Sequence, residues 1–103
     1  MSVRFTRVLP VLLALCGCTS AYEKARGQDT AEAYRTFLRE NPGDPASTMA
    51  RGRLAELEFQ HARRQHTVLG YKRFLASFGD TSRASDAKVL LEGLRFEAAR
   101  HEG

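Results

Sequence analysis

Residues 25–38 read Ala-Arg-Gly-Gln-Asp-Thr-Ala-Glu-Ala-Tyr-Arg-Thr-Phe-Leu, and residues 62–75 read Ala-Arg-Arg-Gln-His-Thr-Val-Leu-Gly-Tyr-Lys-Arg-Phe-Leu. The two stretches stand 37 residues apart, and seven of 18 positions in the windows 25–42 and 62–79 are identical. Further matches at this offset are Ala50 with Ala87, Leu54 with Leu91, and Leu57 with Leu94. Self-similarity at a period of about 34–47 residues is typical of helical repeats. The sequence therefore predicts repeated helical units.

The apolar residues inside each unit follow the period of a helix. Tyr34, Phe37 and Leu38 stand at i, i+3 and i+4, and the second copy keeps this spacing. No stretch alternates between apolar and polar residues as a strand would. We therefore predict an all-α fold of antiparallel helix pairs. The expected elements are a short frayed turn near 20–27 and helices near 30–40, 46–63, 67–78 and 83–100.

Polar and turn-forming residues mark the expected helix ends. Asp29 with Glu32 predicts a capping box for the helix near 30–40. Residues 41–43, Asn-Pro-Gly, end that helix, because a residue before proline avoids the helical region. Asp44 is expected to cap the following helix with Pro45 at its first position, and Gly79 to end the helix near 67–78.

This pattern resembles the tetratricopeptide family. Leu54 and Ala55 match the first helix of a unit, and Tyr71, Phe74 and Leu75 match the second. The variant is similar to repeats of outer-membrane-assembly lipoproteins of the BamD type and related periplasmic proteins. The resemblance covers roughly residues 25–100. It implies a helical solenoid that binds a partner protein without catalysing a reaction, and it leaves the partner unidentified.

The N-terminus has the layout of a secretory signal. Arg4 and Arg7 precede a short apolar run that is too brief to span a bilayer, for which about 20 apolar residues are needed. Leu15-Cys16-Gly17-Cys18 then resembles the lipobox of bacterial lipoproteins, which implies that Cys18 carries the lipid. The alternatives are a metal or redox cysteine pair and a cytosolic N-terminal helix.

The predicted domain organisation follows from this boundary. Residues 1–17 are a lipoprotein signal peptide, residues 18–28 a lipidated N-terminus with a short linker, and residues 29–103 the helical domain. The resemblance implies a protein anchored in the bacterial envelope and facing the periplasm. Thr19 and Ser20 lack the aspartate that retains many lipoproteins at the inner membrane, so the outer membrane is favoured.

The charge excludes a nucleic-acid-binding protein. The net charge of the whole chain is +4. Residues 1–17 hold Arg4 and Arg7 and no acid, so 14 basic residues stand against 12 acidic ones in the remainder. A nucleic-acid footprint would need a clustered basic patch.

The residues that carry chemistry do not form a catalytic or metal-binding pattern. His61, His66 and His101 have no carboxylate at ligand spacing beside them. Glu56 and Glu58 stand two apart on a predicted helix, where side chains do not face each other, so they cannot act as an acid and base pair. We therefore expect no catalytic residue, metal or cofactor. A small metal-binding protein that uses the histidines is kept as an alternative.

Two residue sets are candidates for partner binding. Arg26, Arg63 and Arg100 recur at the offset of 37, each near a helix end, where a cation offsets the helix dipole or forms a row for an acidic partner. Val89, Leu90 and Phe96 lie on a side of the last helix that no following helix in this sequence covers. The favoured function is a lipid-anchored periplasmic adaptor that binds a protein or a second copy. The alternative is a structural subunit that completes a larger or self-associated solenoid.

Overall fold

A computed structural model describes residues 20–102 of the protein, and within that range every regular element is a helix. The predicted all-α class is therefore confirmed. The lipidation expected at Cys18 and the signal peptide expected at 1–17 lie outside the described residues. The helices are α2 (Ala21–Gln28), α3 (Ala31–Glu40), α4 (Ser47–Gln65), α5 (Val68–Phe78) and α6 (Ala84–Glu102).

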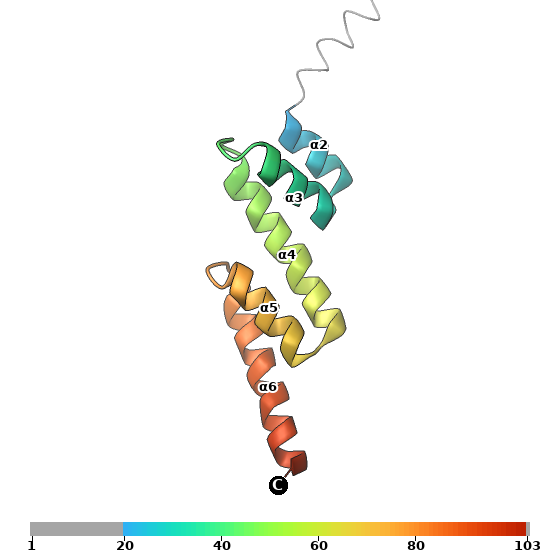
Figure 1. Ribbon diagram of the computed structural model, residues 1–103, viewed down its shortest axis with the longest axis vertical. Helices are drawn as coiled ribbons and strands as arrows, with labels where there is room; N and C mark the ends of the chain where they lie inside the picture. The colour runs from blue at the N-terminus through green and yellow to red at the C-terminus, as the bar shows by residue number, and fades with distance from the viewer. Residues whose placement is uncertain (1–19, 103) are drawn as a thin grey trace, which may run out of the picture.

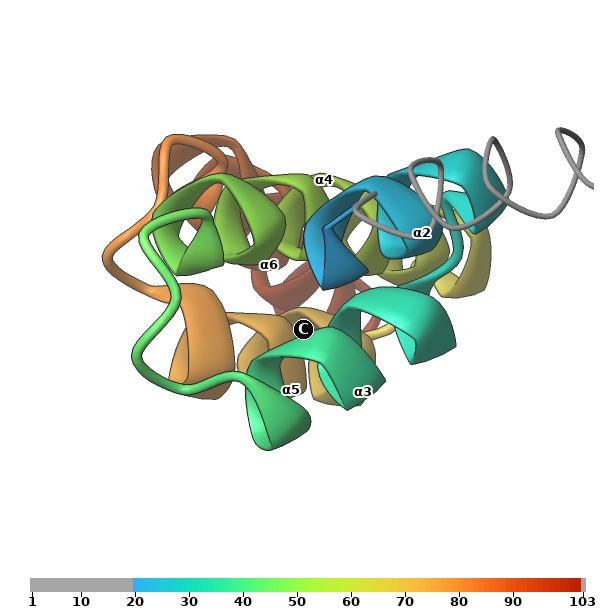
Figure 2. The same ribbon diagram turned by 90° about the horizontal axis from the view of Figure 1, so that it is seen from above.

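The helices zigzag along one long axis, with α2 near one end and the C-terminus at the other (Figure 1). Seen along that axis, α3 and α5 lie on one side and α2 and α4 on the other (Figure 2). Each helix packs against the next along the chain, and α4 contacts both α3 and α5. The long helix α4 therefore joins the α2–α3 pair to the α5–α6 pair.

The core is a line of aromatic and small side chains between these helices. Tyr34 and Tyr71 are its largest fully buried side chains. Phe59 of α4 meets Phe74 of α5 edge to face, with the ring centroids 5.5 Å apart. Buried alanines let the backbones approach closely around these rings. They are Ala25, Ala50, Ala55, Ala62, Ala84 and Ala87.

The segment expected to be a frayed turn near 20–27 is instead the helix α2. The Ser20 hydroxyl accepts the backbone N–H of Glu23 at 3.1 Å, which caps the first turn. Tyr22 packs its ring edge to face on Phe37, 5.7 Å between centroids, and Ala25 is buried. A helix of eight residues is marginal by itself, so packing on α3 stabilises it.

Two predicted caps are placed differently. Thr30, and not Asp29, caps α3 by accepting the N–H of Ala33 at 3.1 Å. Asp44 accepts the N–H of Ala46 at 2.8 Å within a turn, and α4 begins after it at Ser47. In both places the polar side chain serves the turn before the helix. The predicted end of α5 at Gly79 is confirmed.

Asp29 is needed in the connection between α2 and α3. It takes φ +51°, a left-handed conformation that ends α2, and its N–H donates to the carbonyl of Ala25. Its carboxylate accepts the hydroxyl of Tyr34 at 2.8 Å. It also accepts two hydrogen bonds from Arg53 of α4, at 2.9 and 2.7 Å. One side chain thus holds α2, α3 and α4 together.

Candidate interaction surface on helix α6

Helix α6 has one covered side and one exposed side. Ala84, Ala87 and Leu91 are buried where α6 packs on α5. On the opposite side, Val89 and Phe96 are 70% and 63% exposed. They are seven residues apart and so lie on one face of the helix. We call Val89, Gly93 and Phe96 the α6 stripe. The C-terminal part of α6 extends beyond α5 (Figure 1).

Leu90 is placed differently from Val89 and Phe96. It is half-buried and packs against the core, at the edge of the covered side. Of the three residues predicted to dock a partner, the structure therefore leaves Val89 and Phe96 freely exposed and gives Leu90 a partly structural position.

The equivalent aromatic residue of α4 shows what a covered position looks like. Phe59 is only 2% exposed, with Phe74 at its edge and the Arg83 guanidinium 5.0 Å from the ring centre. Around Phe96 the only such contact among the described residues is with the Arg100 guanidinium, 6.0 Å from the ring centre. Burial of a phenyl ring stabilises a protein, and Phe96 has much more ring surface left to bury than Phe59.

A cavity of about 290 Å³ opens between α4 and α6, beside the α6 stripe. Phe59, Val89 and Leu90 supply its apolar wall. Charged side chains form the rest of its lining. They are Arg63, Arg83 and Asp86.

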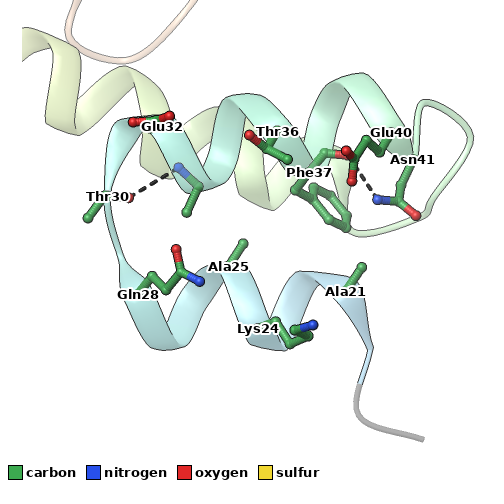
Figure 3. Close-up of a pocket in the computed structure, with 11 residues that line it drawn as sticks. Ala21, Lys24, Ala25, Gln28, Thr30, Glu32, Thr36, Phe37, Glu40 and Asn41 are labelled. Atoms are coloured by element: carbon green, nitrogen blue, oxygen red, sulfur yellow. Dashed lines mark hydrogen bonds between the residues drawn. The ribbon is translucent and has the colours of Figure 1, made fainter. Parts of the chain in front are cut away.

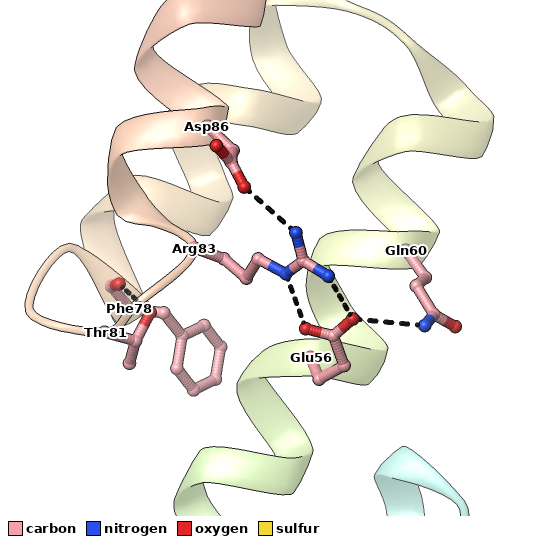
Figure 4. A network of polar contacts seen from close by, with 6 residues as sticks. All are labelled: Glu56, Gln60, Phe78, Thr81, Arg83 and Asp86. Atoms are coloured by element: carbon pink, nitrogen blue, oxygen red, sulfur yellow. Dashed lines mark hydrogen bonds and ion pairs between the residues drawn. The ribbon is translucent and has the colours of Figure 1, made fainter.

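A polar network fixes the position of α6 against α4 next to this cavity (Figure 4). Arg83 donates to both carboxylate oxygens of Glu56, at 2.7 and 2.9 Å, and to Asp86 at 2.9 Å. Gln60 donates to Glu56 at 3.3 Å. The hydrogen bonds from Arg83 are the main reason that the pKa of Glu56 lies below its usual value. The carboxylate therefore stays ionised and the two-pronged contact persists at neutral pH.

Sequence reasoning missed this network. Glu56 and Arg83 are 27 residues apart, and neither type recurs at the offset of 37, where Gly93 and Ala46 stand. Glu58, considered with Glu56 for acid–base chemistry, binds Arg35 at 2.6 Å instead. Each carboxylate thus has its own arginine partner, and nothing in the spacing along the chain pointed to either pair.

The three recurring arginines are exposed and lie on three helices, α2, α4 and α6. Each stands in the last turn of its helix, where its charge opposes the helix dipole. Arg63 borders the cavity beside the α6 stripe. Arg100 contacts Glu97 at 3.7 Å, whereas Arg26 and Arg63 form no ion pair among the described residues.

Another cavity, with a volume of about 370 Å³, lies between α2 and α3 (Figure 3). Lys24 and Glu32 are among its charged residues, and Thr30 within it already caps α3. Because basic and acidic side chains both line this cavity, its charge does not favour a positively or a negatively charged ligand.

The histidines do not converge on one another. His66 shares a hydrogen bond of 2.8 Å with the buried hydroxyl of Tyr71, while His61 and His101 are exposed. Within residues 20–102, no three His, Cys, Asp or Glu side chains cluster as metal ligands. None of the helices described is long and apolar enough to cross a membrane. Comparison of the chain with protein-family models, with curated proteins and with solved structures gave no match.

Proposed function

We propose that this chain is a non-catalytic protein-interaction module with a tetratricopeptide-like fold, repeating at about 37 residues. The helical hairpins α2–α3 and α4–α5 support the proposal. Each has a left-handed residue at its turn, Asp29 or His66, followed by a capping threonine. A buried tyrosine stands four residues after each threonine. Such repeats present long surfaces to partners.

A lipid on Cys18 would anchor the module to the periplasmic face of a membrane, with the outer membrane favoured. The sequence Leu15-Cys16-Gly17-Cys18 supports this part of the proposal. The anchor would precede α2, and α6, which carries the stripe, lies at the opposite end of the helical stack from α2 (Figure 1). The module would then hold its docking surface away from the membrane, where a periplasmic partner has access.

The exposure of Val89 and Phe96 carries the proposal of an adaptor. Exposed apolar residues that gather on one face of a small domain mark interaction sites, whereas single ones are ordinary. The alternative of a metal carrier has no ligand cluster in its favour within residues 20–102. An adaptor that docks a protein through α6 therefore fits the surface best.

Two measurements test the proposal. The intact mass of the membrane-extracted protein should correspond to a lipidated chain that begins at Cys18. A chain that begins at Met1 without lipid, or at Cys16, would contradict the anchor.

For the module, replacing Val89 and Phe96 with serine should abolish the capture of a partner protein by crosslinking, while the helical content of the chain is unchanged. Met49→Ser on α4 is the matched control, because Met49 is an equally exposed apolar side chain, at 62%, away from α6.

A further inference from the structure

The α6 stripe and the neighbouring cavity share Val89 and lie next to each other on the surface. Phe96 offers an exposed ring, and Phe59, Val89 and Leu90 offer an apolar wall. Leu90 and Phe96 are six residues apart on one continuous helix, which separates them by about 9 Å along its axis. Phe96 therefore cannot enter the cavity of its own chain.

We propose that α6 binds α6 of a second copy of this chain, antiparallel, with the two helices crossing at Gly93. In such a pair, residues equally far from Gly93 on either side lie at the same height along the helix axes. Phe96 lies on the same side of the helix as Val89, so it contacts Val89 of the second copy at the rim of the cavity that Val89 lines, and the symmetry makes this contact twice. This inference rests on the proposed function, because it names the partner of the same docking surface.

The crossing point is suited to a close approach of two helices. Gly93 is exposed, and a Cβ placed there would have no neighbouring atom within 4 Å. A glycine at the crossing of two helices lets their backbones come near, and the larger side chains on either side then interdigitate. Val89 and Phe96 flank Gly93 by four and three residues, so both reach the contact.

The charges beside the stripe favour the antiparallel orientation. Asp86 and Arg100 stand seven residues before and after Gly93, so the crossing brings Asp86 of each copy to Arg100 of the other. Their side chains are 56% and 66% exposed. Arg100 would give up its 3.7 Å contact with Glu97, and at Asp86 it would join the hydrogen bond of 2.9 Å that Asp86 already accepts from Arg83. A parallel pair would put like charges together, which is unfavourable. The pattern therefore favours the antiparallel pair over the parallel one.

Charge reversal tests the pairing of the two α6 helices directly. The sample is the full chain, purified from its native host in a mild detergent. A single pair of helices makes a small interface, so the dimer should be weak and visible at roughly 100 μM chain by sedimentation equilibrium. Asp86→Arg and Arg100→Asp should each weaken association several-fold, and the double variant should restore it. A monomeric wild-type chain, or a double variant as weak as the single ones, would overturn the inference.

Two further variants keep the test independent of folding. Phe96→Ser should lower association at least tenfold with unchanged circular dichroism, since the ring is exposed in the free chain.

Gly93→Cys should form a disulfide between copies under mild oxidation, because the crossing brings the two Cα atoms within about 7 Å. Gly52→Cys is the matched control, an exposed glycine on α4 with equally open surroundings. The wild-type chain reports any background from Cys16 and Cys18. Equal crosslinking at both sites would contradict the pairing.

The outcomes separate this inference from the proposed function. A chain that is monomeric, yet loses a different protein on Phe96→Ser, refutes the dimer and leaves the adaptor standing. A chain that passes the charge-reversal test, yet carries no lipid and captures nothing else, refutes the anchored adaptor and leaves the dimer standing.

Discussion

The connection between α2 and α3 and the connection between α4 and α5 have nearly the same backbone and different side-chain chemistry. Asp29 and His66 end their helices at φ +51° and +48°, and each side chain bonds the hydroxyl of a buried tyrosine at 2.8 Å. Asp29 also binds Arg53 of the next helix. The position 37 residues after Arg53 is Leu90, so His66 has no cation in the corresponding place.

The two connections therefore differ at two corresponding positions, the turn residue and the residue of the next helix that faces it in the first connection. The carboxylate of Asp29 accepts hydrogen bonds from Arg53 one helix further on, whereas the imidazole of His66 has a leucine at the corresponding position. The side chains of Arg53 and Asp29 are 41% and 40% exposed, so losing one partner would weaken the connection modestly and would not leave a buried charge. The left-handed turn and the buried tyrosine are thus shared features, and the ion pair is an addition to one connection.

The largest effect should come from the tyrosines, which the two connections share. Tyr34 and Tyr71 are 1% and 0% exposed. Replacing a buried aromatic ring with alanine costs about 3–5 kcal/mol, so both Tyr34→Ala and Tyr71→Ala should bring this small domain close to unfolding. Urea unfolding measures both. A loss at one position less than half of that at the other would show that the two connections are not equivalent in packing.

The second-largest effect should be a pH dependence of stability in the α2–α3 connection. Hydrogen bonds from Arg53, and then from the Tyr34 hydroxyl, lower the pKa of Asp29 to about 2. Because the folded pKa is depressed, the stabilisation is fully present above the unfolded value of about 4 and is lost as the pH falls through about 2. Amide protection factors in α2 should therefore drop between pH 4 and pH 2.

The asparagine variant is the control for this pH effect. An amide side chain cannot ionise, so in Asp29→Asn the protection of α2 should start lower at pH 5 and change less between pH 4 and pH 2. Glu56 and Asp80 also have lowered pKa values through their arginine partners, so a whole-molecule melt would mix several carboxylates. An unaltered pH slope in α2 of the variant would exclude Asp29 as the titrating group.

The helical class and four of the helix ranges could be predicted from the sequence because they depend on local spacing. Tyr34, Phe37 and Leu38 define a face by themselves, and Gly79 ends α5 where expected. The helix α2 was missed because its stability comes from Tyr22 packing on Phe37. Local patterns carry no information about such a contact between helices.

The candidate site divides in the same way. The exposure of Val89 and Phe96 followed from their position on the last helix, and the structure agrees. The cavity and the contact between Glu56 and Arg83 depend on how α4 and α6 are juxtaposed, which a single sequence does not reveal. Leu90, which the sequence placed with Val89, is half-buried because α6 turns that side toward the core.

The smallest effect should come from moving the ion pair from the first connection to the second. His66→Asp alone creates a carboxylate without a cation, and Leu90→Arg alone removes a half-buried leucine and adds a third arginine beside Arg63 and Arg83. Both single changes should destabilise the domain. The double variant should regain about 0.2–1 kcal/mol relative to their sum, the range for an exposed pair. A double-mutant cycle in urea at low micromolar chain, below the concentration expected for pairing, measures this coupling. A coupling of zero would mean that α6 does not lie against the α4–α5 connection as α4 lies against the α2–α3 connection. The 37-residue repeat would then not extend into α6.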